Sequence, residues 1–70
     1  LLYRLGKFDE ALAYLRRAYA AKPEPEVAAH IGEVLWAQGK RAEAESVWRD
    51  ADKAHPGNAD LAATIKRFLP

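Results

Sequence analysis

The 70-residue sequence contains no cysteine and no methionine. Without cysteine the chain can form no disulfide, present no thiolate nucleophile and build no zinc site from thiolate ligands. No apolar run approaches the roughly 18 residues that would span a bilayer, and no signal peptide is recognisable. We therefore expect a soluble chain that does not insert directly into a membrane.

An excess of charge of one sign is also missing. Eleven Lys and Arg residues stand against ten Asp and Glu residues, and the formal net charge is +1. Charges of both signs are interspersed, so no basic stretch predicts binding to nucleic acid. Half of the residues are apolar, which is typical of a folded rather than a disordered chain. The abundance of Ala, Leu, Glu, Lys and Arg favours helix.

The residue sets that carry out chemistry are missing as well. No Ser or Cys has a suitable His and acid partner, and the phosphate-binding and dinucleotide-binding fingerprints are absent. His30 and Glu33 are spaced as a possible metal pair on a helix, but a third ligand is lacking. We therefore expect no enzyme activity, no cofactor and no metal.

What the sequence does contain is an internal repeat. Residues 6–11 (Gly-Lys-Phe-Asp-Glu-Ala) and residues 39–44 (Gly-Lys-Arg-Ala-Glu-Ala) share Gly, Lys, Glu and Ala at an offset of 33. The same offset relates Leu2 to Leu35, Arg16 to Arg49, Ala18 to Ala51 and Pro23 to Pro56. A fixed period of this length is typical of arrays of small structural units.

The apolar residues within each unit are spaced for helices. Phe8, Leu12, Leu15 and Tyr19 follow one another at steps of three or four, and the later segments repeat this spacing. The predicted helices span residues 1–5, 8–22, 25–38, 41–54 and 59–69. Connections this short make neighbouring helices antiparallel, so the predicted fold class is all-α.

Turn-forming residues separate these segments. Gly6 and Gly39 suit the left-handed backbone that follows a helix C-terminus. Pro25 suits a first helical turn, where its missing N–H is not needed. Asn58 is a favourable N-cap for the last helix. Each predicted boundary thus has a local chemical reason.

These residues resemble the tetratricopeptide repeat, a helix–turn–helix unit of roughly 34 residues. The resemblance implies a partial unit over residues 1–24, a complete unit over 25–58 and a C-terminal capping helix over 59–70, within an α-solenoid that forms a right-handed superhelix. It identifies these signature residues: Ala11, Ala18, Pro23, Gly32, Leu35, Ala44, Trp48, Ala51 and Pro56. Ala28 departs from the pattern, because a bulky residue is usual there.

The signature positions also have a physical logic. Gly32 and Ala44 lack bulk, so we expect the two helices of one unit to approach closely there. Ala51 should leave room for the capping helix, while Trp48 and Tyr19 should fill the space that the small residues leave between units. One hairpin cannot bury its apolar stripe alone, and stacking makes a continuous core.

In this family, ligands commonly lie along the first helices of successive units, on the concave face of the array. The resemblance therefore implies the following partner-binding candidates: Tyr3, Arg4, Glu26, Ala29, His30, Glu33, Trp36, Ala37, Asp60, Ala63, Thr64 and Arg67. Ala29, His30 and Glu33 stand where one subset of the family carries Lys and Asn to grip a terminal carboxylate, so such a clamp is not expected. Trp36 could anchor a partner or pack on a neighbouring helix.

The predicted function is a protein–protein interaction module, an adaptor or assembly scaffold that binds other proteins or peptides. The alternative is a terminal structural cap and self-association surface, with ligand binding located upstream and the apolar side of helix 8–22 exposed for a homo-oligomer. The apolar opening and the Ala-rich units suggest the C-terminal fragment of a longer, bacterial, periplasm-facing protein.

Overall fold

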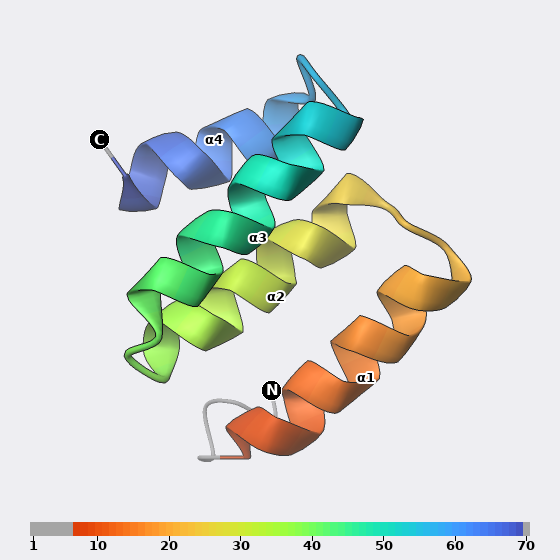
Figure 1. Cartoon of the computed structure of the whole chain (residues 1–70), viewed down its shortest axis with the longest axis vertical. Coiled ribbons are helices and arrows are strands. Elements are labelled where there is room, and N and C mark those ends of the chain that lie inside the picture. The colour runs from red at the N-terminus through yellow and green to blue at the C-terminus, as the bar shows by residue number, and fades with distance from the viewer. Residues whose placement is uncertain (1–6, 70) are drawn as a thin grey trace.

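Four helices make up the part of the chain that the structure, a computed structural model, describes, namely residues 7–69 (Figure 1). They are α1 (Phe8–Ala21), α2 (Pro25–Ala37), α3 (Arg41–Ala54) and α4 (Ala59–Phe68). No strand occurs within residues 7–69, so the all-α prediction is confirmed. The predicted boundaries hold to within one residue for all four, whereas the helix expected over residues 1–5 lies outside the described residues.

The helix ends have the chemistry that the sequence predicts. Pro25 occupies the first turn of α2. The Asn58 side chain accepts a hydrogen bond of 3.0 Å from the Leu61 backbone N–H and so caps α4. Gly39 follows α2 with a φ of +84°, and Gly57 precedes α4 with a φ of +81°. Both glycines therefore adopt a left-handed backbone that other residues strain to reach.

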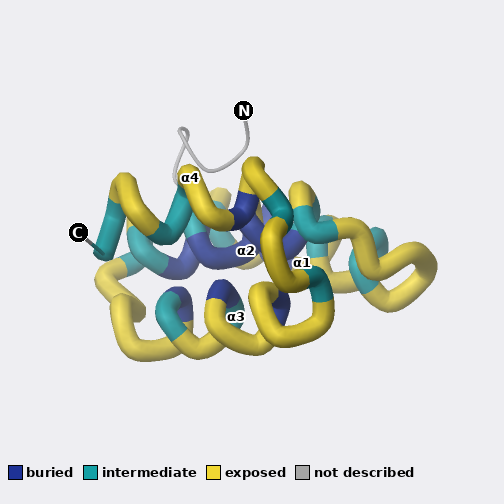
Figure 2. Tube along the Cα trace, turned by 90° about the horizontal axis from the view of Figure 1, so that it is seen from above, coloured by how far each residue is buried: buried dark blue, intermediate teal, exposed yellow. Residues whose placement is uncertain are grey.

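Helix α2 lies at the centre of the molecule and packs against α1, α3 and α4. In Figure 2 the buried part of the tube runs along α2, while the outward sides of the other helices are exposed. Six of its residues are buried, and they cover most of its circumference: Ala28, Ala29, Ile31, Gly32, Val34 and Leu35. The other three helices each bury a narrower stripe, as expected for helices with solvent on one side.

The hairpin of α2 and α3 is held by one large side chain that lies on a glycine. Trp48 of α3 is fully buried, and its indole rests where a side chain of Gly32 would be. A Cβ atom on Gly32 would lie only 2.0 Å from the indole Nε1 atom. That N–H donates a hydrogen bond of 3.1 Å to the carbonyl oxygen of Ala29. Trp48 therefore occupies the space next to Gly32. The sequence predicted only that Gly32 and Ala44 allow the two helices to approach closely, and the structure adds that the missing side chain of Gly32 makes room for the indole.

Helix α4 packs on this hairpin through aromatic rings. The Phe68 ring centroid lies 5.2 Å from that of Trp48 and 5.3 Å from that of Trp36, and the two tryptophans are 5.8 Å apart. Leu61, at the other end of α4, is fully buried. Since Trp48 contacts both Gly32 within the hairpin and Phe68 beyond it, one indole joins three helices. Aromatic pairs at these separations add to the burial of apolar area.

None of the helices within residues 7–69 has the length and hydropathy of a segment that spans a bilayer.

Candidate functional site: the face shared by α2 and α4

Four of the six predicted partner-binding residues of α2 occupy its one solvent-facing strip. Glu26, His30 and Ala37 are exposed, and Glu33 is partly exposed. At 100° per residue these four positions fall within a narrow sector of the helix, opposite the buried residues. Tyr3 and Arg4, which were expected to extend this strip, lie outside the described residues.

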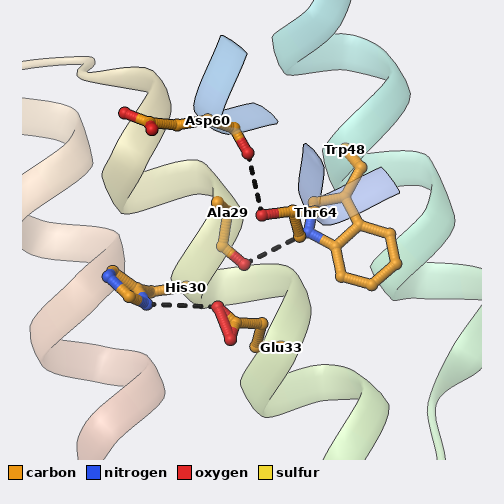
Figure 3. A network of polar contacts seen from close by, with 6 residues as sticks. All are labelled: Ala29, His30, Glu33, Trp48, Asp60 and Thr64. Carbon is orange, nitrogen blue, oxygen red and sulfur yellow. Dashed lines mark hydrogen bonds and ion pairs between the residues drawn. The ribbon is translucent and has the colours of Figure 1, made fainter. Parts of the chain in front are cut away.

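The predicted residues of α4 continue the strip onto the next helix. Asp60, Ala63 and Arg67 are exposed and Thr64 is partly buried. The Thr64 hydroxyl donates a hydrogen bond of 3.0 Å to the Asp60 carbonyl oxygen, so the threonine binds its own helix and not α2. Figure 3 shows Asp60 and Thr64 beside the stretch of α2 that carries Ala29, His30 and Glu33. Packing of α4 on α2 therefore brings residues some thirty positions apart onto one face.

His30 and Glu33 interact with each other. The His30 Nδ1 atom lies 3.3 Å from a Glu33 carboxylate oxygen, one helical turn away (Figure 3). Glu33 is the less exposed partner, with 26% of its side-chain surface accessible against 65% for His30. Within residues 7–69, no three His, Cys, Asp or Glu side chains gather to hold a metal ion. The pair therefore contributes polar contacts to the face and orients Glu33.

Two predicted contact residues lie beneath this face. Ala29 is only 5% exposed, and what it contributes is the carbonyl oxygen that accepts the Trp48 N–H. Trp36 is half-buried against both Trp48 and Phe68, with the Arg41 guanidinium 4.9 Å from its ring centroid. Of the two possibilities open for Trp36, the structure thus favours packing on neighbouring helices. Its ring supports the face rather than projecting from it.

Two grooves escaped the sequence analysis because each is assembled from more than one helix. One, of about 360 Å³, lies between α1 and α3 above α2 and is lined by these residues: Arg16, Tyr19, Ala20, Ala28, Ile31, Val47, Asp50 and Ala51. The other, of about 560 Å³, lies beside α4 and is lined by Asp52, Ala62, Ile65, Lys66 and Leu69. The sequence did contain a sign of the second groove. The apolar residues of helix 59–69 extend over a wider sector of the helix than contact with one neighbouring helix would cover.

Comparison with known proteins agrees with the architecture. A sequence model of the tetratricopeptide-repeat family matches residues 2–68. Neither the search of curated proteins nor the search of solved structures returned a match. Repeats of this family generally serve as protein-interaction modules, on a scaffold that performs no catalysis of its own. Because the match covers almost the whole chain and the helices form the expected hairpins, the chain belongs to the tetratricopeptide-repeat family.

Proposed function

We propose that this chain acts as a protein-interaction module and binds a polypeptide partner on the face shared by α2 and α4, without chemistry of its own. We call this surface the α2–α4 face and define it by these residues: Glu26, His30, Glu33, Ala37, Asp60, Ala63, Thr64 and Arg67. One observation carries the proposal. Packing of α4 against α2 aligns the solvent-facing strips of two helices that are separated in the sequence by all of α3. In this proposal residues 25–58 form the complete unit and α4 is the cap.

The composition of the α2–α4 face indicates what kind of partner fits. It carries three carboxylates, from Glu26, Glu33 and Asp60, against the single guanidinium of Arg67. Ala37 and Ala63 are small, and they leave the backbone of both helices open to close approach. A peptide with Lys or Arg side chains beside small apolar ones complements this surface in both charge and shape. Each exposed charge pair adds little affinity, so the acidic cluster acts mainly on specificity and association rate.

The proposal is tested with peptides selected from a random displayed library on the isolated chain. We expect the selected peptides to be enriched in Lys and Arg. Titration of such a peptide into isotope-labelled chain should shift backbone NMR signals of α2 and α4 more than those of α1 and α3. The triple variant Glu26→Gln, Glu33→Gln, Asp60→Asn should weaken binding about tenfold, because three favourable charge contacts are removed together.

A matched control is available in α1. Glu10 is, like Glu26, an exposed carboxylate in the first turn of its helix, but it lies off the α2–α4 face. Glu10→Gln should leave peptide affinity unchanged. Selection of acidic peptides, or signal shifts confined to the groove between α1 and α3, would contradict the proposed binding mode.

A further inference from the structure

A second surface lies on the opposite side of α4. The groove lined by Asp52, Ala62, Ile65, Lys66 and Leu69, here called the α4 outer groove, holds about 560 Å³. Its floor is apolar, because Ile65 and Leu69 are only half-buried and Ala62 is exposed. At 100° per residue, these α4 positions point away from the side that carries Asp60, Thr64 and Arg67. The groove is therefore separate from the α2–α4 face.

The two rims of the α4 outer groove carry charges of opposite sign. Asp52 stands on the α3 side, and Lys66 stands on the α4 side. Both side chains are exposed, and no ion pair joins these two described residues. One rim is thus negative, the other is positive, and apolar side chains lie between them.

We infer that a second copy of this chain covers the α4 outer groove and forms a two-fold symmetric dimer. In a two-fold symmetric interface, the same surface patch of both copies is in contact. A residue of one copy that contacts a second residue of the partner receives the same contact in return, so the patch must be complementary to itself. A two-fold axis that runs along the groove, between its two rims, places Asp52 of one copy opposite Lys66 of the other, and the reverse. The apolar side chains of both copies then cover one another. The surface of the groove is therefore complementary to itself in charge and in hydrophobicity.

This dimer leaves both α2–α4 faces free, because each lies on the far side of its α4. The inference therefore does not depend on the proposed peptide binding. If both hold, one dimer presents two peptide sites, and partners with two binding segments gain avidity. The surface is also different from the apolar side of helix 8–22, which the sequence suggested for self-association.

The dimer is measured by sedimentation equilibrium on the 70-residue chain, at concentrations up to about 1 mM, because a patch this small gives weak association. We expect a monomer–dimer equilibrium. Ala62→Glu should raise the dimer dissociation constant about tenfold or more, since it buries a charge in the apolar floor. Ala42→Glu is the matched control: the residue is an exposed alanine of α3 that belongs neither to this groove nor to the α2–α4 face, and the variant should dimerise like the unmodified chain.

Charge exchange gives the sharper test. Asp52→Lys makes both rims positive and Lys66→Asp makes both negative, so each single variant should dimerise about tenfold more weakly. An equimolar mixture of the two should form a heterodimer, and the double variant with both exchanges should regain the homodimer. Circular dichroism verifies that each variant stays helical.

A chain that stays monomeric across this range would overturn the inference, and so would a mixture of the two charge variants that does not associate. A dimer insensitive to Ala62→Glu but disrupted by Tyr14→Glu would also overturn it. Tyr14, which is 70% exposed on α1, would then mark the interface.

Discussion

The hairpin of α2 and α3 and the two outer helices are held in different ways. The hairpin buries nine residues, six in α2 and three in α3, around the hydrogen-bonded Trp48 indole. Helix α1 buries only Ala11 and Leu12, and α4 buries only Leu61. Stability in such a structure is concentrated where burial is dense, and the outer helices depend on the centre for their packing. Because α4 buries so little of its surface, some of its apolar side chains remain available for further contacts.

The largest effect is expected at the centre. Trp48→Ala removes a fully buried indole together with its hydrogen bond, and it separates α4 from its aromatic support. We expect a loss of about 4 kcal/mol in the free energy of unfolding. A chain of this length has roughly 3 to 10 kcal/mol in total, so the variant should lose a large part of its stability. Circular dichroism during urea denaturation measures this; a midpoint close to that of the unmodified chain would show that the hairpin does not depend on Trp48.

Gly32→Ala tests the same contact from the other side. Alanine favours helix over glycine by about 1 kcal/mol, but the new Cβ atom would lie 2.0 Å from the indole Nε1 atom. The steric effect should win, with a net destabilisation of about 3 kcal/mol. Gly39→Ala is the comparison: nothing lies within 4 Å of a Cβ atom there, and only the φ of +84° opposes it. It should destabilise by about 1 kcal/mol. Equal effects would contradict the importance of the Gly32 contact.

The two outer helices can be weakened one at a time. Leu61→Ala in α4 should destabilise by about 3 kcal/mol, and Leu12→Ala in α1 by about 2 kcal/mol, because Leu61 is fully buried and Leu12 is 9% exposed. Amide hydrogen exchange should speed up mainly within the helix that carries the change, while α2 and α3 keep their protection. A uniform acceleration across the helices would mean that the chain unfolds only as a whole.

A smaller effect is expected at the start of α4. Asn58 is the only residue at a helix start within residues 7–69 whose side chain accepts a capping hydrogen bond, since α1, α2 and α3 have none. Asn58→Ala should destabilise by about 1 kcal/mol, and Asn58→Ser should restore most of it. Thermal denaturation of the two variants measures the difference. An effect below a few tenths of a kcal/mol would mean that other contacts place the end of α4.

The smallest effect is expected on the exposed side of α3. Arg49 forms an ion pair with Glu45 one turn away, and the Arg49 side chain is 67% exposed. Glu45→Gln should therefore destabilise by only about 0.3 kcal/mol, and less at high salt. Urea denaturation at two salt concentrations measures this. A loss above 1 kcal/mol would show that the surface of the hairpin contributes as much as a helix cap.

The sequence predicted the helices well because their boundaries have local causes. Proline at the start of α2, asparagine before α4 and glycine after α2 each act within a few residues. The short connection between the two segments also predicted that α2 and α3 pack as antiparallel neighbours. These features need no knowledge of the distant chain. The division into a partial unit, a complete unit and a cap remains a prediction of the same kind.

The candidate site was predictable only in part. The resemblance to the family implied Glu26, His30 and Ala37 as contact residues, and all three are exposed on α2, while their role in binding remains a prediction. The sequence could not tell that Ala29 is buried, because the Trp48 side chain that bonds to its carbonyl oxygen comes from another helix. The packing of Trp36 could not be predicted either, because the rings that it contacts belong to residues twelve and thirty-two positions further along the chain.

The sequence by itself thus determined the helical class, the turns, the repeat and the family. Only the tertiary structure decided which side chain occupies the space at Gly32, which way Trp36 packs, and that Asp52 and Lys66 face one groove. The physical reason is that turns and caps depend on interactions over a few residues. Burial and grooves, by contrast, depend on how whole helices are positioned against one another.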